Sequence, residues 1–228
     1  MCTSYESNPK IGFDAYRLFP APSFDYRSEI YKDYLAPIFL RVADEWRTEP
    51  ASFGLVPRKH IPPHVRPYDT MNARAETVGD KRSYKSAWNK LQLCLIPCSS
   101  FFEPNYETGK AVRWRIRFQD NTPTAIAGLW RAWEEPDGAM SLSFTMLTVN
   151  ADNHPLMSRF HKPDDEKRSL VLITPREYED WLTCRSTDEA RSFLRLAPAE
   201  ELFAEPHPLP PRKPRATSFG GDQGSLLD

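Results

Sequence analysis

The chain has 228 residues, and its 30 basic and 31 acidic side chains leave a net charge of −1, which gives no overall attraction to nucleic acid. This length supports a core without metal or disulfides, and four cysteines are too few for a secreted disulfide scaffold. The sequence has neither an apolar run long enough to cross a membrane nor a signal-like start, so we expect a cytoplasmic protein with reduced thiols and no membrane partner.

Composition changes once along the chain. Apolar residues recur throughout residues 1–204, whereas residues 205–228 are rich in proline and basic side chains. We expect one domain over residues 1–204 and a disordered tail over 205–228, which is either a solvated extension or a contact to DNA or a partner. With 22 prolines against 9 glycines, long helices are disfavoured.

Local patterns predict the elements in chain order. Tyr84, Trp88 and Leu91 share one face of a helix that Asp80 can cap. Runs of β-branched, aromatic or aliphatic residues then predict strands at residues 93–97, 111–118, 124–130, 142–149 and 170–173. Cap signals, each followed three residues later by a glutamate, predict short helices after Thr174 and Ser186. The result is an α+β single domain dominated by antiparallel β-sheet, barrel-like, with short flanking helices.

One predicted strand has two different faces. Between residues 111 and 118, apolar side chains alternate with Arg113, Arg115 and Arg117. A half-buried sheet with a solvated outer face has this pattern, and we favour that interpretation over a stripe that binds DNA phosphates.

Cys2 can supply chemistry that no internal cysteine can. Once Met1 is removed, the thiol and the free α-amine of Cys2 lie on adjacent carbons. Their ordinary pKa values, roughly 8.5 and 7.7 to 8, leave both nucleophiles partly available at neutral pH. Such a pair reacts with an aldehyde: the amine condenses to an imine, and the thiol then closes a thiazolidine ring. A cysteine at position 2 is most often only a second residue, so this interpretation depends on the rest of the chain.

Further segments lie in the order that one family shows. They are Phe53-Gly54-Leu55-Val56-Pro57, Asn72-Ala73-Arg74-Ala75-Glu76-Thr77, Phe101-Phe102-Glu103-Pro104, and Pro155-Leu156-Met157 leading to His161. Together with Met1-Cys2 they resemble the SOS response-associated peptidase family, also called abasic-site processing proteins. Family members start Met-Cys-Gly-Arg and carry Trp-Gly-Leu-Ile-Pro, Asn-Ala-Arg-x-Glu-Thr, Gly-Phe-Tyr-Glu-Trp and His-x-Arg-Met-Pro. Each motif is weak alone, but five in register from Cys2 to about Trp181 are specific.

The resemblance implies an enzyme of the DNA damage response that recognises abasic sites in single-stranded DNA. It implies a covalent thiazolidine link between Cys2 and the ring-opened sugar, in a lyase-like reaction, after a peptidase step or a cellular aminopeptidase has removed Met1. We expect no cofactor and no metal, because the spacing of cysteines and histidines does not favour a zinc site. We also expect a monomer that is nucleoid-associated when bound to DNA.

Besides Cys2, the resemblance implies three catalytic residues. Asn72 would orient Cys2 through hydrogen bonds, while Glu103 and His161 would move protons. The apolar sequence around Glu103 favours a raised carboxyl pKa, and histidine titrates near neutral pH. His154 is a rival for His161, but the Pro-Leu-Met that follows His154 matches the segment upstream of the family histidine.

Four residues are implied in DNA binding. Arg74 and Arg82 resemble residues that grip phosphates with a planar guanidinium. Phe53 occupies the position of a tryptophan expected to stack on bases. Arg168 is assigned as the arginine that follows the histidine, although acidic residues are inserted between the two.

Several positions depart from the family pattern. Thr3 and Ser4 replace Gly-Arg, Phe53 replaces tryptophan, and Pro104 replaces the tryptophan after the glutamate. Because stacking on an aromatic ring is worth about 1 to 3 kcal/mol per base, these changes should weaken binding to DNA. Two other functions therefore stay open: a cysteine peptidase that acts on polypeptides, and a DNA-binding descendant that has lost the reaction.

Overall fold

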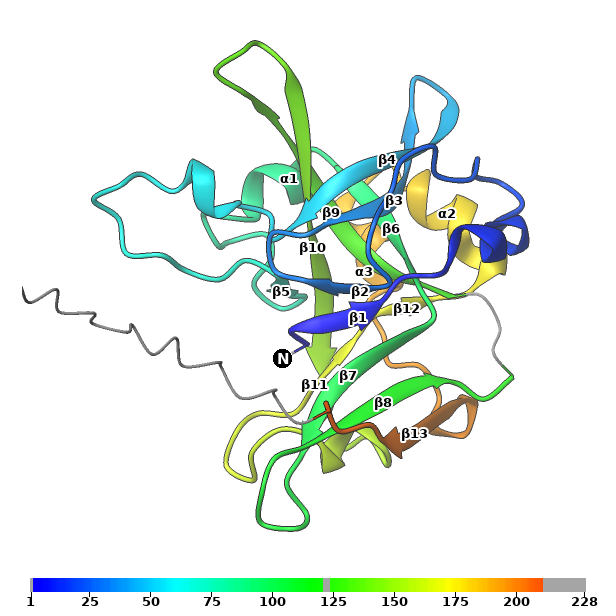
Figure 1. The fold of residues 1–228 in the computed structure, drawn as a ribbon. Coiled ribbons are helices and arrows are strands. Elements are labelled where there is room, and N and C mark those ends of the chain that lie inside the picture. Colours follow the sequence, from blue (N-terminus) through cyan, green and yellow to red (C-terminus); the bar gives the residue numbers. More distant parts are fainter. Residues whose placement is uncertain (1, 121–123, 211–228) are drawn as a thin grey trace, which may run out of the picture.

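The computed structural model describes residues 2–120 and 124–210, and a closed ring of five strands lies at its centre (Figure 1). The ring consists of β3 (Leu35–Val42), β4 (Glu45–Phe53), β6 (Leu93–Cys98), β9 (Thr124–Glu134) and β10 (Met140–Asn150). β10 closes the ring because it pairs with β9 along one edge and with β4 along the other. The β4–β10 pairing is parallel, and the other pairings of the ring are antiparallel.

The last residues of β10 hold two further strands. β5 (Asn72–Arg74) pairs with Met146–Thr148 on the edge used by β4, and β11 (Arg168–Leu170) pairs with Thr148–Asn150 on the other edge. β12 (Leu172–Ile173) then continues alongside β9. Segments that are far apart in the sequence therefore meet at one end of β10.

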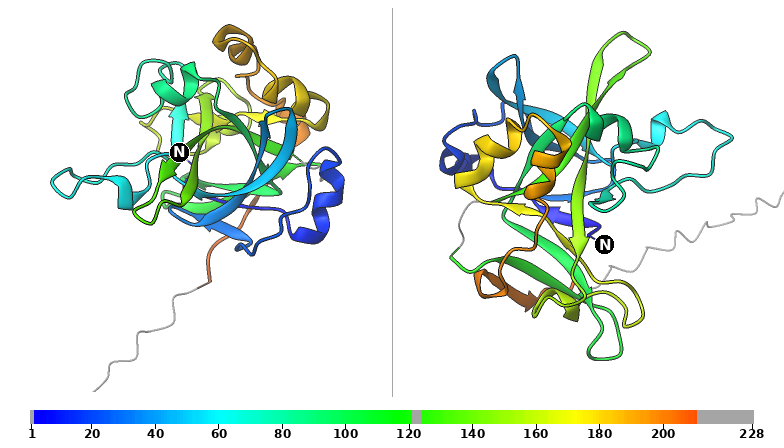
Figure 2. Two further views of the ribbon diagram at one scale, coloured as in Figure 1. Left: turned by 90° about the horizontal axis from the view of Figure 1, so that it is seen from above. Right: turned by 180° about the vertical axis from the view of Figure 1, so that it is seen from behind.

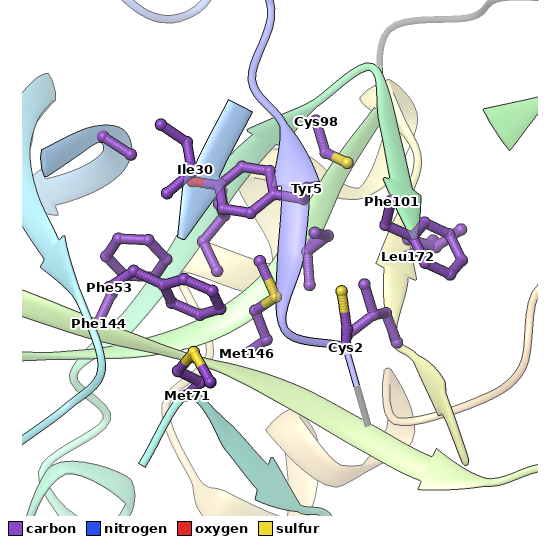
Figure 3. Close-up of a cluster of buried hydrophobic side chains, with 14 of the residues drawn as sticks. Cys2, Tyr5, Ile30, Phe53, Met71, Cys98, Phe101, Phe144, Met146 and Leu172 are labelled. Atoms are coloured by element: carbon purple, nitrogen blue, oxygen red, sulfur yellow. The ribbon is translucent and has the colours of Figure 1, made fainter. Parts of the chain in front are cut away.

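A second sheet of five strands lies beside the barrel, in the order β13–β8–β7–β1–β2. Its strands are β13 (Leu202–Pro206), β8 (Val112–Phe118), β7 (Ser100–Asn105), β1 (Ser4–Glu6) and β2 (Glu29–Tyr31). Tyr5 and Phe101 of this sheet join Phe53 and Phe144 of the barrel in one buried cluster, so the two sheets share a core. Figure 3 shows this cluster, with Cys2 at its margin.

Short helices and turns flank the barrel (Figure 2). The helices are α1 (Lys85–Asn89), α2 (Tyr178–Leu182) and α3 (Thr187–Ser192), and the 3₁₀ turns are η1 (Lys10–Tyr16), η2 (Arg58–His60), η3 (Met157–Arg159), η4 (Pro175–Glu177) and η5 (Ala199–Glu201). Trp88 of α1 and Trp181 of α2 belong to a second buried cluster. The indole N–H of Trp181 also donates to the carbonyl of Cys94 at 2.9 Å, which ties α2 to β6.

The predicted α+β architecture is confirmed, and each predicted strand is present, although residues 170–173 divide between β11 and β12. Thr174 and Glu177 form the predicted capping box, and the hydroxyl of Ser186 accepts from the N–H of Glu189 at 3.1 Å. The helix predicted after Asp80 is shorter than expected. It covers only Lys85–Asn89, and Leu91 ends it with a φ of 51°.

The long hairpin of β3 and β4 was not predicted. Its turn residues Ala43 and Asp44 have φ values of 48° and 66°, so both adopt the left-handed conformation without the glycine that usually marks such a turn. Five consecutive residues of β3, Ala36–Leu40, are buried, so the strand shows no polar–apolar alternation.

The C-terminal sheet extends past the boundary that we expected at residue 204. β13 runs to Pro206, and the N–H of His207 donates to the carbonyl of Arg113 at 2.8 Å. This pairing with β8 gives Glu205 and Pro206 a place in the sheet. The rest of the predicted tail from residue 211 lies outside the described residues. None of the described helices is long and apolar enough to cross a membrane.

Candidate active site

Cys2 and Asn72 are joined across the fold. The side-chain amide of Asn72 donates a hydrogen bond to the carbonyl oxygen of Cys2 at 2.7 Å. Asn72 begins β5, whose register on β10 is fixed, so the barrel sets its position. Cys2 is 1% exposed, and its thiol donates to the carbonyl of Ser4 at 3.1 Å. The barrel thereby fixes the backbone of the N-terminal cysteine.

Glu103 lies on β7 with its side chain inside the protein. Its carboxyl is 2% exposed, and this burial raises its pKa to about 8. At neutral pH the carboxyl is therefore mostly protonated and can donate a proton. This agrees with the raised pKa expected from the apolar sequence around Glu103.

His161 lies against Glu103. Its Nδ1 is 3.4 Å from Oε2 of Glu103, and its Nε2 is 3.1 Å from the carbonyl oxygen of Arg168. Because a carbonyl oxygen only accepts, Nε2 carries the ring proton and Nδ1 can accept one from Glu103. Burial lowers the pKa of His161 to about 4, so the ring is neutral at neutral pH. The transferable proton therefore lies on the carboxyl and not on the imidazole.

The backbone of His161 is held in an unusual conformation. Its φ is 66°, which few residues other than glycine adopt. Its N–H donates to the carbonyl of Pro104 at 2.8 Å, and Phe160 forms a β-bridge with Asn105. The strand that carries Glu103 thus also positions the histidine, and the strained backbone is of the kind found at functional sites.

The thiol of Cys2 is within electrostatic reach of Glu103. Burial is the main cause of the raised pKa of this thiol, and the negative charge of Glu103 is the next. The structure therefore brings Cys2, Asn72, Glu103 and His161 together, although they come from four distant parts of the sequence. Their uncharged forms dominate at neutral pH, as is typical of titratable groups removed from water.

Arg168 is not placed to bind DNA. Its side chain is 2% exposed and forms a bidentate pair with Glu76, at 2.9 and 3.0 Å, and a further pair with Glu166 at 2.8 Å. It also donates to the carbonyl of Thr148 at 2.6 Å. The sequence-based assignment is therefore corrected: these contacts engage the guanidinium internally, and Arg168 positions the site because its own carbonyl orients His161.

Phe53 is not placed to stack on bases. It is fully buried, with its ring stacked on Phe144 at 5.1 Å and edge-on to Tyr5 at 5.7 Å. Figure 3 shows Phe53 within the cluster shared by the two sheets. The expected stacking role is wrong for this chain because the ring at this position belongs to the core.

The two remaining arginines are exposed in different places. Arg74 is half-exposed and pairs with Glu166 at 2.7 Å, so the network around Arg168 reaches the surface there. Arg82 lines a hollow of about 890 Å³ beside α1, together with Lys90 and Arg131. Both guanidinium groups are therefore accessible, as phosphate contacts require.

The arginine stripe of β8 carries paired charges. Arg113 bonds to Glu29, Arg115 bonds to Glu205, and the guanidinium of Arg117 lies 4.7 Å from the ring centre of Phe203. The side chains of Arg113 and Arg115 are only 16% and 32% exposed, so this face is charge-paired and partly covered, and not the solvated outer face that we expected.

His154 has a structural role and is not part of the candidate site. Its Nδ1 accepts from the N–H groups of Leu156 and Met157, and its Nε2 lies 2.9 Å from the carbonyl oxygen of Ala197. Both ring nitrogens are thus used to hold the loop that leads to His161. Within the described ranges, no group of three or more His, Cys, Asp or Glu side chains could hold a metal ion.

Tyr84 is a site residue that sequence reasoning missed. Its hydroxyl donates to the carbonyl of Asn72 at 3.0 Å, so the residue that caps α1 supports the start of β5. The sequence signal was present, because Tyr84 was placed on the apolar face of the predicted helix, but nothing in that pattern connects it with Asn72.

Comparison with known proteins finds a matching family model and similar curated proteins. The family described as SOS response associated peptidase matches residues 14–208. The abasic site processing protein YoqW of Bacillus subtilis is 29% identical over 151 residues, which cover 63% of this chain and 64% of the relative. The abasic site processing protein HMCES of Gallus gallus is 24% identical over 175 residues, covering 68% of this chain and 50% of the relative.

Solved structures show the same fold. A crystal structure of a protein from Bordetella bronchiseptica has a TM-score of 0.81 and 32% identity, and the match covers 91% of this chain and 100% of that one. A protein from Bacteroides thetaiotaomicron gives a TM-score of 0.70 at 21% identity, covering 89% and 90% of the two chains. The curated relatives match over a smaller share of their own length: the chain spans just under two thirds of YoqW and half of HMCES.

Proposed function

The chain belongs to the SOS response associated peptidase family, and on that premise we propose that it recognises abasic sites in single-stranded DNA and links to them covalently through Cys2. The observation that carries this proposal is the meeting of an N-terminal cysteine with a protonated carboxyl and a neutral imidazole. Relatives named as abasic site processing proteins support the choice of substrate.

The first half of the reaction uses the α-amine that Met1 removal exposes. Its lone pair attacks the C1′ aldehyde of the ring-opened sugar and forms a C–N bond. The resulting carbinolamine loses water to give an imine, and Glu103, protonated at neutral pH, donates the proton that the departing hydroxyl needs. The amide of Asn72 holds the Cys2 backbone during this step.

The second half closes the ring. The sulfur of Cys2 adds to the imine carbon, the C–S bond forms, and the electron pair of the C=N bond moves to nitrogen. The thiol proton passes to that nitrogen, and Glu103 with Nδ1 of His161 forms the relay. The product is a thiazolidine, and atoms and charge balance without oxidant, metal or cofactor.

Asn72 also offers an acceptor for the α-amine. Its Oδ1 is buried and finds no hydrogen-bond partner among the described residues. A buried acceptor without a donor is costly, and the amine N–H of processed Cys2 is a donor that could reach it from the same residue whose carbonyl Asn72 already binds. This supports an orienting role for Asn72.

The charge states favour the aminothiol reaction over a cysteine peptidase acting on polypeptides. A peptidase of that kind needs a thiolate paired with imidazolium. Here burial raises the thiol pKa and lowers that of His161 to about 4, so neither charged form is favoured. Removal of Met1 requires hydrolysis of one peptide bond, by this site or by an aminopeptidase.

The test is a denaturing gel after incubation with single-stranded DNA that carries one abasic site. Wild-type protein, with Met1 shown by mass spectrometry to be removed, should give a shifted band without reductant. Cys2→Ala retains an α-amine but no ring-closing nucleophile, so its imine should appear only after trapping with borohydride.

Two outcomes would contradict the proposal. A stable link formed by protein that retains Met1 would show attack by the thiol alone. The absence of any link from processed wild type, combined with salt-sensitive binding to the same DNA, would identify a descendant that has lost the reaction.

A further inference from the structure

The guanidinium of Arg113 reaches across the outer face of the second sheet. Arg113 lies on β8, yet it bonds to Glu29 on β2, and β7 and β1 lie between these two strands (Figure 1). Because neighbouring strands are about 4.8 Å apart, the two residues come from strands about 14 Å apart. We call this ion pair the cross-sheet pair. It passes over β1, the strand that follows Cys2 in the chain.

Neighbouring groups fix the cross-sheet pair. The guanidinium of Arg113 lies 3.3 Å from the ring centre of Phe102 on β7, and the hydroxyl of Tyr31 donates to Glu29 at 2.6 Å. The carbonyl of Arg113 accepts from the N–H of His207 at 2.8 Å. Both charged side chains are largely covered, so the pair is held more firmly than one between two exposed side chains.

Ser4 of β1 lies against the cross-sheet pair and also contacts the candidate active site. Its hydroxyl oxygen is 3.5 Å from the guanidinium of Arg113, and its carbonyl accepts the hydrogen bond from the thiol of Cys2 at 3.1 Å. Ser4 departs from the family pattern, which has an arginine at this position. The short side chain leaves the space that the guanidinium from β8 occupies. Ser4 therefore connects the cross-sheet pair with the sulfur of Cys2.

Cys2 is thus held from two sides. Asn72 of the barrel donates to its carbonyl oxygen, while Ser4 of the second sheet accepts from its thiol. The two contacts act on different parts of the residue, the backbone and the sulfur. In the proposed reaction the backbone amine forms the imine and the sulfur closes the ring. A change on the second sheet should therefore affect the second step more than the first.

We propose that Arg113 is a positioning residue for Cys2, which through Ser4 holds the sulfur in place for the ring-closing step. This inference rests on the proposed function. In that step the C–S bond forms, the electron pair of the C=N bond moves to nitrogen, and the thiol proton passes to that nitrogen, so Arg113 exchanges no proton. A displacement of a reacting atom by about 1 Å can cost about a hundredfold in rate, so a contact behind the sulfur affects the reaction.

The first measurement is labelling of the cysteines with iodoacetamide, read for each cysteine by mass spectrometry of its peptide. It requires neither DNA nor the reaction. Arg113→Gln removes one charge of the cross-sheet pair and should label Cys2 about fivefold faster or more, because labelling requires local opening of β1. Cys98 is buried in the same cluster but lies on β6 of the barrel, so it should label as in wild type.

The second measurement separates the two steps on abasic single-stranded DNA. Borohydride traps the imine, whereas only the thiazolidine survives denaturation without reductant. Arg113→Gln should form the imine at the wild-type rate and close the ring about tenfold more slowly, because the amine remains oriented by Asn72 and the sulfur does not. The trapped imine should therefore accumulate in this variant.

Arg115→Gln is the matched control. Arg115 lies two residues further along β8, on the same face of the sheet, and pairs with Glu205 on β13, away from β1. Its variant loses an equivalent ion pair and should label and react as wild type does. Glu29→Gln removes the other partner of the cross-sheet pair and should change both measurements in the direction of Arg113→Gln. It keeps the test decisive if Arg113→Gln does not fold.

The inference is overturned if the cross-sheet variants label Cys2 at the wild-type rate, if Cys98 becomes reactive together with Cys2, or if Arg115→Gln has the same effect. A parallel fall of imine formation and ring closure would also overturn it, because Arg113 would then support only the fold. Failure of the proposed function is distinct, since labelling does not depend on the reaction. A wild type that forms no link, together with faster labelling of Cys2 alone in Arg113→Gln, would support the positioning of Cys2 and contradict the reaction.

Discussion

Glu103 and Glu135 each face a histidine, yet their pKa values move in opposite directions. Glu103 is buried beside His161, and burial raises its pKa to about 8. Glu135 lies just after β9 beside His60, and hydrogen bonds from Lys59 first, then from Ser141, lower its pKa to about 2. Exclusion of water is the main cause of the raised pKa of Glu103, and the hydrogen bond from Lys59 is the main cause of the lowered pKa of Glu135. Neither histidine is the leading cause of either shift.

The two glutamates therefore have different uses. Glu103 retains a proton at neutral pH and can donate it to a reacting group, as an acid catalyst must. Glu135 is a permanent anion that attaches the loop after β4 to a hairpin. Changes at Glu103 should alter chemistry and pH dependence, whereas changes at Glu135 should alter only the mobility of the loop.

The largest effect should follow Glu103→Gln. The amide cannot transfer a proton, so formation of the link should slow by about a hundredfold or more, measured as a time course on denaturing gels. Wild-type rate should fall as pH rises through about 8, because Glu103 loses its proton there. The variant should lack that step, and an unchanged rate with an unchanged pH profile would remove Glu103 from the mechanism.

Stability should respond to pH at the same residue. The folded pKa of Glu103 is raised above its ordinary value of 4.5, so its contribution to stability is complete below that value and is lost as pH rises through about 8. The Tm of wild type should therefore fall by a few degrees relative to that of Glu103→Gln between pH 5 and pH 9. His161 has the opposite effect on stability, because its folded pKa is lowered: its contribution to the stability of the fold is lost as pH falls from 6.5 through about 4. Equal pH dependence of the two Tm values would contradict this.

Arg168→Gln should reduce stability strongly. It removes the buried guanidinium that bonds to Glu76, Glu166 and the carbonyl of Thr148, and because water can solvate the two glutamates, which are 50% and 32% exposed, the lost hydrogen bonds should cost about 1 to 3 kcal/mol. Urea unfolding measures this cost. Arg168→Lys, which keeps the charge but not the bidentate geometry, should lose less. A Gln variant as stable as wild type would show that the network adds nothing to folding.

Tyr84→Phe should have a moderate effect on both stability and rate. The hydroxyl makes one hydrogen bond, to the carbonyl of Asn72, worth about 1 kcal/mol. Because that bond supports the strand which orients Cys2, the link should form a few times more slowly even at temperatures where the variant is fully folded. A rate equal to that of wild type would limit Tyr84 to a structural role.

Glu135→Gln should have the smallest effect. The side chain of Glu135 is 15% exposed, but that of its partner Lys59 is 57% exposed, and ion pairs with an exposed partner contribute little to folding. We expect no measurable change in Tm and no change in link formation on abasic single-stranded DNA. A slowed link would show that the two regions are coupled and would break the comparison.

Short-range signals in the sequence predicted the elements that depend on short-range contacts. The capping box at Thr174 works within four residues, and the alternation along β8 places Ile116 and Phe118 in the core while the arginines between the apolar residues stay partly exposed. The β3–β4 hairpin was not predicted because its turn residues carry no local signal for a left-handed conformation, and because burial removes the alternation of β3. Phe53 and Arg168 were misjudged for a related reason, since a motif position states which residue occurs and not whether it is buried.

The sequence by itself predicted the α+β class and the family resemblance, and through that resemblance it proposed Cys2, Asn72, Glu103 and His161 as one set, because motif order and local patterning are properties of the chain. Only the tertiary structure decided their charge states, since desolvation depends on which segments cover a group. It also decided that Arg168 orients His161 from within, through its backbone carbonyl, and that Tyr84 supports Asn72. Contacts between residues distant in the sequence exist only after the barrel has closed around β10.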